Sequence, residues 1–127
     1  PAFAGASRMK PSRSEDDLVH LDEMLDAAGR LARYVAQTSD DRFEHDDALY
    51  DAICMCLMRF GEGARLLSEE TKARLPDVPW PDVVNLRHRI AHGYAHLRPS
   101  VLWLTATVSM PPLASALEVL RDELSRS

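Results

Sequence analysis

The sequence of 127 residues predicts an all-α domain, an antiparallel bundle of four to five helices. Apolar side chains recur every three or four residues along most of the chain, which is the spacing of helices with one buried face. Polar or proline-rich stretches separate these segments. One apolar segment, 100–109, is partly β-branched, but no second strand exists to pair with it, so we expect a helix there as well.

The first helix is expected to begin near Ser14, a suitable N-cap for a first turn that contains three acidic residues. It should end in the polar stretch 37–41. Its predicted apolar face consists of Leu18, Leu21, Leu25, Ala28, Ala32 and Val35.

A second helix is expected to bury Leu49, Ile53, Cys56, Phe60, Ala64 and Leu67, with Asp46, Asp47 and Asp51 on its outer face. Gly61 and Gly63 lie within this pattern. Because no strand precedes them, we interpret them as sites of close helix–helix approach and not as a phosphate-binding loop. Ser68 can cap a short helix that ends before Pro76.

Prolines delimit the remaining helices. Pro76, Pro79 and Pro81 predict a rigid turn, and Pro81 suits the first position of a third long helix. Its apolar side would carry Val83, Val84, Leu86, Ile90 and Ala91. After an interruption at Pro99, a last helix is expected to break at Pro111 and Pro112 and to resume over residues 113–124.

We assign residues 15–127 to this helical domain and residues 1–14 to a disordered tail, because the tail lacks periodicity. The chain starts with Pro1, so we expect residues 1–8 to be foreign and Met9 to open the native chain. No apolar run approaches the ~20 residues of a membrane span, and no secretory signal is apparent. We interpret Cys54 and Cys56 as small buried side chains of a cytoplasmic protein.

Charge is unevenly distributed along the chain. Residues 15–51 hold 12 acidic and three basic side chains, whereas residues 52–127 hold eight acidic and nine basic ones. This distribution argues against general coating of nucleic acid and confines any RNA contact to the second half. The first half is either a solvated acidic face or a docking surface for a basic partner, with Asp46 and Asp47 as candidate contacts.

A cationic motif interrupts the acidic protein. Residues 85–98 contain three arginines, three histidines and no acid. Within this segment Arg87 is followed after four residues by His92, and after one more by Tyr94. On a helix Arg87 and His92 would lie ~140° apart, so a groove shared by two copies of the chain suits them better than a pocket in one.

These residue types fit RNA cleavage without a metal. Histidine can take a proton from a 2′-hydroxyl or give one to the leaving oxygen near neutral pH. Arginine presents a permanent planar cation that matches phosphate oxygens and stabilises charge on phosphorus. Such a reaction would leave a 2′,3′-cyclic phosphate and a 5′-hydroxyl.

The motif and its surroundings closely resemble the HepT-like branch of the HEPN superfamily. The resemblance covers about residues 15–125. Beside the motif it rests on Pro79, Trp80, Pro81, Val101, Leu102, Trp103, Pro112 and Leu113, and upstream on Phe43, Asp47, Ala52, Phe60, Gly61, Glu62, Leu67 and Ser68.

This resemblance implies a HEPN-like helical toxin of a toxin–antitoxin pair, a homodimeric, metal-independent ribonuclease without a cofactor. Arg87 and His92 occupy the catalytic positions of the family motif. Tyr94 matches the tyrosine to which a minimal nucleotidyltransferase antitoxin adds AMP, which silences the toxin. An assembly with that antitoxin can extend the dimer to a larger hetero-oligomer.

The chain departs from the family motif at one position. His88 stands where the family usually has asparagine, and it could hold the scissile phosphate or carry a second proton. With Arg89, it is a supporting candidate for phosphate or RNA contact.

Three alternatives accompany this interpretation. His88, His92 and His96 could form one stripe that binds Zn²⁺ or Ni²⁺, but no carboxylate or cysteine lies nearby in sequence to complete the site. Trp80 and Trp103 could stack on bases, although packing suits their apolar surroundings better. Finally, the domain could be a non-catalytic partner of a nucleotidyltransferase that binds nucleotide or RNA.

Overall fold

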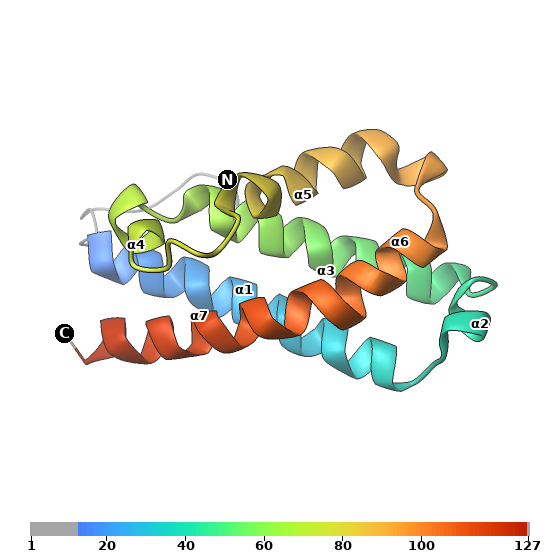
Figure 1. The fold of residues 1–127 in the computed structure, drawn as a ribbon, viewed down its shortest axis with the longest axis horizontal. Coiled ribbons are helices and arrows are strands. Elements are labelled where there is room, and N and C mark those ends of the chain that lie inside the picture. Colours follow the sequence, from blue (N-terminus) through green and yellow to red (C-terminus); the bar gives the residue numbers. More distant parts are fainter. Residues whose placement is uncertain (1–12, 127) are drawn as a thin grey trace, which may run out of the picture.

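Four long helical rods run alternately in opposite directions along the molecule (Figure 1). The computed structural model describes residues 13–126, in which no strand occurs. The rods are α1 (Arg13–Ala36), α3 (Asp47–Leu66), α5 (Trp80–Gly93) and a continuous last rod, which comprises α6 (Pro99–Leu104), a π-helical turn (Thr105–Ser109) and α7 (Met110–Ser125). The predicted all-α antiparallel bundle is therefore confirmed, whereas the expected tail, residues 1–14, lies almost entirely outside the described residues.

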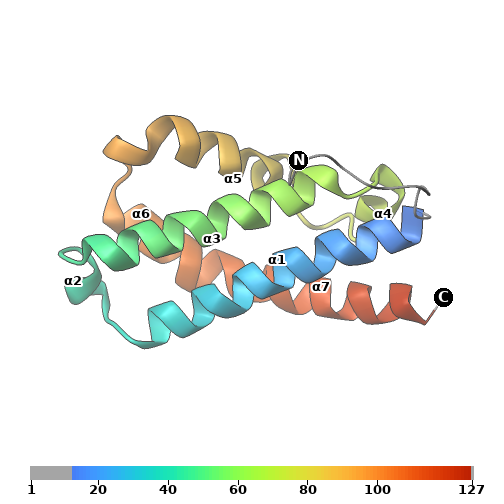
Figure 2. The same cartoon turned by 180° about the vertical axis from the view of Figure 1, so that it is seen from behind.

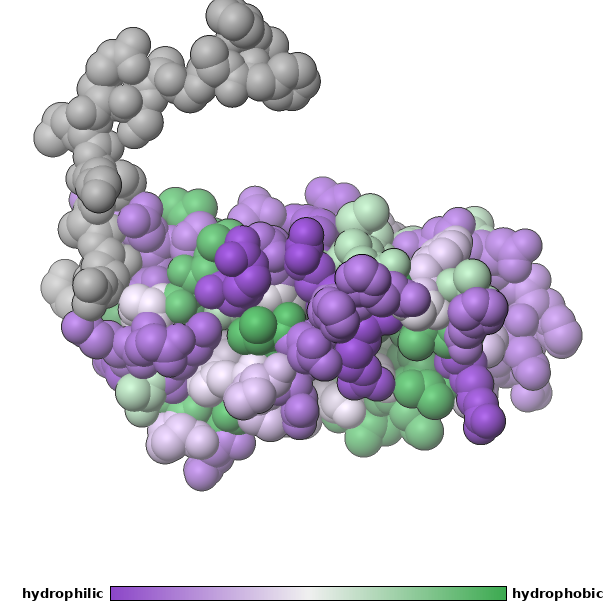
Figure 3. Space-filling view, turned by 90° about the horizontal axis from the view of Figure 1, so that it is seen from above, coloured by the Kyte–Doolittle hydropathy of each residue, from purple (hydrophilic) through white to green (hydrophobic). Residues whose placement is uncertain are grey.

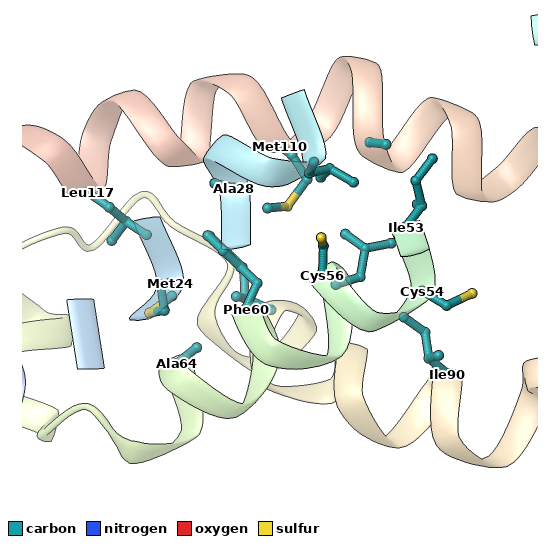
Figure 4. Close-up of a cluster of buried hydrophobic side chains, with 14 of the residues drawn as sticks. Met24, Ala28, Ile53, Cys54, Cys56, Phe60, Ala64, Ile90, Met110 and Leu117 are labelled. Atoms are coloured by element: carbon teal, nitrogen blue, oxygen red, sulfur yellow. The ribbon is translucent and has the colours of Figure 1, made fainter. Parts of the chain in front are cut away.

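The core lies where α1, α3 and the last rod meet (Figure 4). The predicted face of α3 is correct, because Ile53, Cys56, Phe60 and Ala64 are all buried. On α1 the face is centred differently from the prediction, since Met24 and Leu31 are fully buried while Ala32 is exposed. The largest fully buried side chains are Leu21, Met24, Leu31, Phe43, Ile53, Leu57, Phe60, Leu117 and Leu120.

The glycines of α3 allow close helix contacts on two sides, as predicted. A Cβ atom at Gly63 would come within 3.2 Å of the carbonyl oxygen of His20 on α1. A Cβ atom at Gly61 would lie 2.9 Å from the backbone nitrogen of Arg87 on α5. Seen from behind, α5 follows α3 along one edge of the bundle (Figure 2). Gly61 thus brings the helix with the cationic motif against α3.

The last rod does not break at Pro111 and Pro112, so the predicted interruption is wrong. Instead α6 passes through the π-helical turn, where the backbone N–H of Met110 donates to the carbonyl of Thr105. The two prolines then follow this π turn directly, as the second and third residues of α7. The wider π turn accommodates the proline rings that a regular α-helix would reject.

By length and composition alone, the stretch Pro99–Ser125 is apolar enough to cross a membrane, and 22% of its most apolar window is buried. The sequence prediction that no apolar run approaches the length of a membrane span did not foresee this stretch. One such helix is weak evidence, because a core helix of a soluble protein satisfies the same criterion. The exposed side chains Leu104 and Val108 belong to this rod.

Short elements complete the fold. The one-turn helix α2 (Asp40–Phe43) was not predicted; Ser39 caps it, and it buries Phe43. Ser68 caps helix α4 (Glu69–Ala73), as predicted, and its hydroxyl accepts from Thr71 N and donates to Asp17 on α1.

Both tryptophans serve packing, and both cysteines are free and buried, as predicted. The indole N–H of Trp80 donates to the carbonyls of Lys72 and Leu75, each at 3.0 Å. Trp103 lies against Phe43 with ring centroids 5.5 Å apart.

Candidate functional site

The cationic motif lies on the exposed side of α5 and on the turn that follows it. Arg87, His88, Arg89 and His92 are all exposed, whereas Ile90 between them is buried and anchors the helix to the core. The α-helix ends at Gly93, and Tyr94 opens a 3-10 turn, η1 (Tyr94–His96). Viewed from the side of α5, the surface is largely hydrophilic with small apolar patches (Figure 3).

A carboxylate on α3 fixes the arginine of the motif. Glu62 Oε2 lies 3.2 Å from Arg87 Nε, and the same carboxylate accepts two hydrogen bonds from Arg65, at 2.7 and 3.1 Å. The guanidinium of Arg65, and more weakly that of Arg87, hold the pKa of Glu62 below its usual value. The side chain of Arg87 remains 55% exposed, so its outer N–H groups can still reach a ligand.

A shallow hollow of about 550 Å³ lies beside this cluster. Three of its lining side chains, Arg65, Arg87 and His88, can carry positive charge, and Asp82 is its one acid. The remaining lining residues are Pro81, Val84 and Asn85. An anionic group such as a phosphate would find two guanidinium donors within one small surface.

The two histidines of α5 lie next to each other. The ring centroids of His88 and His92 are 4.3 Å apart and the rings are tilted by 45°. His96 lies beyond the end of α5, so the three histidines do not share one continuous helix. Within residues 13–126, no group of three or more metal-ligating side chains could hold a metal ion.

Within one chain, the side chains of Arg87 and His92 contact different residues. Arg87 pairs with Glu62 on α3, whereas His92 contacts His88, and of these two only Arg87 lines the cationic hollow. Arg89 lies at another hollow, of about 20 Å³, among apolar residues between α5 and α6. A single copy therefore groups Arg87 with His88, and His92 with His88, but does not gather all four side chains.

Tyr94 is held by the first turns of α3. Its hydroxyl donates to Asp51 Oδ1, and its ring meets the ring of Tyr50 edge-on, with centroids 5.6 Å apart. The hydroxyl of Tyr50 in turn donates to the carbonyls of Tyr94, at 2.7 Å, and Leu97, at 3.2 Å. The hydrogen bond to Asp51 raises the pKa of Tyr94 to about 12.

Tyr94 borders a groove of about 420 Å³ that carries several acids. They are Glu44, Asp46, Asp47 and Asp51, and the other lining residues are Phe43, Tyr50, Ala95, Leu97 and Pro99. Tyr94 is 45% exposed, so its phenol remains accessible from this groove.

Sequence reasoning missed the two carboxylates of α3 that hold the motif. Asp51 was placed on the outer face, which is correct, but its contact with Tyr94 was not foreseen. The sequence points to Glu62 only as part of the family pattern. The available signal was the acidic residue next to Gly61, because a glycine that admits a second helix also brings its neighbours close to that helix.

Comparison with known proteins adds the family. The profile described as "Ribonuclease HepT-like" matches residues 24–120. Among curated proteins, "Probable ribonuclease HepT" of Thermococcus cleftensis is 25% identical over 109 residues, which cover 86% of this chain and 97% of that protein. "Putative RNase MJ1380" of Methanocaldococcus jannaschii is 22% identical over 97 residues, which cover 76% of this chain and 89% of that protein.

No solved structure matches this chain. The family profile nevertheless spans α3, α5 and α6 completely and most of α1 and α7, so it includes every candidate site residue. The protein belongs to the ribonuclease HepT-like family.

Proposed function

We propose that this protein is the toxin of a toxin–antitoxin pair and cleaves RNA without a metal, with Arg87 and His92 as its catalytic residues. The observation that carries the proposal is the exposed cationic face of α5 in an otherwise acidic chain of the HepT-like family. We place the protein in the cytoplasm, where Cys54 and Cys56 would stay reduced.

In the proposed reaction, the 2′-oxygen of a ribose attacks the adjacent phosphorus while the bond from phosphorus to the 5′-oxygen breaks. His92 accepts the proton of the 2′-hydroxyl. His88 donates a proton to the 5′-oxygen; the 4.3 Å between its ring and that of His92 supports this role. Arg87 binds the phosphate and stabilises the charge that gathers on its oxygens. Arg89 contacts the RNA backbone farther along.

The separate directions of Arg87 and His92 support a site made by two copies of the chain. If a second copy of the chain supplied the missing catalytic side chain, Arg87 could stay with Glu62 and His92 could stay with His88. In an isologous dimer, each of two equivalent grooves would combine Arg87 of one copy with His92 of the other.

We further propose that a minimal nucleotidyltransferase antitoxin silences the protein by adding AMP to Tyr94. The exposed phenol at the edge of an open groove supports this role. The acids of that groove, including Asp47, would face a basic surface of the antitoxin. The added nucleotide phosphate would occupy the cationic face and compete with RNA.

The test is cleavage of RNA by unmodified protein in the presence of EDTA. We expect cleavage products with 2′,3′-cyclic phosphate ends, lost in Arg87→Ala and in His92→Ala. Mass spectrometry must first establish that Tyr94 carries no AMP. Unmodified wild-type protein that binds RNA but leaves it intact would contradict the nuclease.

That outcome would favour a second candidate, a non-catalytic RNA- or nucleotide-binding partner of a nucleotidyltransferase. One observation favours it: Arg87 already has a carboxylate partner and has no contact with His92 within residues 13–126. In that case Arg87→Ala would lower RNA affinity, and no variant would change the integrity of the RNA.

A further inference from the structure

The contact between Tyr94 and Asp51 joins two elements that are distant in sequence. Asp51 lies in the second turn of α3, and Tyr94 lies on the turn after α5, 43 positions later. Asp51 is exposed, and within residues 13–126 the structure assigns it no ion-pair partner. Its carboxylate is therefore available to the one phenol that it touches.

The surroundings fix this pair in place. The Asp46 side chain caps α3 by accepting from Leu49 N at 3.0 Å, which secures the turn that carries Tyr50 and Asp51. The hydroxyl of Tyr50 donates to the carbonyls of Tyr94 and Leu97, and this ties the backbone of η1 to α3. The backbone segments that carry the phenol and the carboxylate, η1 and the start of α3, are thus both held in place, so the contact does not depend on side-chain conformation alone.

We infer that Asp51 is the general base for nucleotidyl transfer to Tyr94. This inference rests on the proposed AMP addition. The Tyr94 oxygen attacks the α-phosphorus of a nucleoside triphosphate, a new bond forms between that oxygen and phosphorus, and the bond to the departing pyrophosphate breaks. The phenolic proton passes to Asp51, to which it is already hydrogen-bonded.

The electrostatics explain why this phenol needs a base. With its pKa raised to about 12, almost no Tyr94 is ionised near neutral pH, so the oxygen cannot attack as a preformed phenolate. The groove already contains four acidic side chains, which disfavour a further negative charge on the phenol. Proton transfer to Asp51 during attack avoids the free phenolate altogether.

The same acids make the groove unsuitable for binding a nucleoside triphosphate. A triphosphate is strongly anionic, and among the lining residues of this groove there is no lysine or arginine. The nucleotide and its divalent cation must therefore arrive on the transferase, which presents the α-phosphorus to Tyr94. This chain supplies the nucleophile and its base.

The experiment measures the rate of AMP incorporation into the full chain by a minimal nucleotidyltransferase of the proposed pair, with labelled ATP and Mg²⁺. Asp51→Asn keeps an oxygen that can accept from Tyr94 but cannot take its proton. We expect Asp51→Asn to lower the rate by roughly 100-fold or more, within the range for loss of a general base. Asp51→Glu should recover part of the rate, because it restores a carboxylate.

Glu118→Gln is the matched control, since it removes one negative charge from the exposed surface of α7, at a residue that does not line this groove. It should be modified at the wild-type rate, and Tyr94→Phe should accept no AMP. Circular dichroism and RNA cleavage by the unmodified Asp51→Asn protein should match wild type, which separates a lost base from a lost fold.

Two failures are distinguishable. If wild-type protein accepts no AMP, the proposed silencing is wrong, and the role of Asp51 is wrong with it. If wild type is modified and Asp51→Asn is modified equally fast, the silencing stands and a base on the transferase replaces Asp51.

Discussion

Gly61 on α3 lies directly beneath the backbone nitrogen of Arg87 on α5, so close that a methyl group at Gly61 would stand 2.9 Å from that nitrogen. The same methyl group would lie 3.0 Å from the carbonyl oxygen of Val83. Both neighbours are backbone atoms, which cannot turn aside as a side chain can. The position of Arg87 relative to α3 therefore depends on the absence of a side chain at Gly61.

Gly61→Ala should push α5 away from α3. We expect the free energy of unfolding to fall by about 1–3 kcal/mol, the usual cost of overpacking, and RNA cleavage to fall as well. Gly29→Ala is the control, because the nearest atom to its added methyl group would be 3.9 Å away. In this helix interior it should raise stability by about 0.5–1 kcal/mol. Urea unfolding of both variants measures the difference, and equal stabilisation by both would contradict the close contact.

Glu62→Gln should increase RNA affinity, because the phosphate would no longer compete with a carboxylate for Arg87 and Arg65. The pairs are exposed, so the expected gain is modest, roughly two- to fivefold. Fluorescence anisotropy can measure it in a His92→Ala background, which prevents cleavage. Glu69→Gln, which changes an exposed acid on α4, should leave affinity unchanged. Weaker binding by Glu62→Gln would mean that the carboxylate mainly holds Arg87 in its binding orientation.

Mixing two inactive variants tests the shared site. Arg87→Ala retains His92, and His92→Ala retains Arg87, so a mixed dimer would contain one complete groove. With random exchange of subunits, we expect roughly a quarter of the wild-type RNA cleavage per chain. Each variant alone should be inactive. A mixture as inactive as its components would show that Arg87 and His92 act within one chain.

Tyr94 should titrate at unusually high pH. Its pKa of about 12 lies above the ordinary value of 10, because Asp51 favours the neutral phenol. A group whose pKa is raised on folding stabilises the fold fully below its unfolded pKa and loses that contribution as pH rises through the folded value. The contribution should therefore be lost between about pH 10 and 12.

Ultraviolet absorbance should show a tyrosine transition near pH 12 that is absent from Tyr94→Phe. The pKa of Tyr50 is also raised, chiefly by burial, so Tyr50→Phe is needed to assign the transitions. The melting temperature of wild-type protein should fall more steeply over this pH range than that of Tyr94→Phe. A single transition near 10 for all tyrosines would refute the hydrogen bond to Asp51.

Periodicity alone predicted the long helices, because each of them buries one apolar stripe whose spacing is visible in the sequence. The face of α3 from Ile53 to Ala64 is the clearest case. The break at Pro111 was wrong for a local reason: a π turn upstream relieves the proline clash, and the sequence carries no simple sign of it.

The site was predicted less completely than the fold. The motif identified Arg87, His88, His92 and Tyr94 as neighbours along the chain, and the structure places all four on the exposed side of α5 and its following turn. Their partners Glu62 and Asp51 were not predicted, because the pairing depends on the register between two antiparallel helices, and only the position of Glu62 next to Gly61 signals it. That register comes from packing, and the Gly61 contact sets it.

Glu62 and Asp51 belong to one rigid helix, 11 residues and ~16 Å apart. An axial slip of α3 by one helical turn would separate Arg87 and Tyr94 from their carboxylates in a single movement. A mutation that shifts α3 and so moves Arg87 therefore also displaces Tyr94, which limits the changes that either residue can tolerate. Under the proposed function, RNA cleavage, which needs Arg87, and silencing, which needs Tyr94, would have to evolve together.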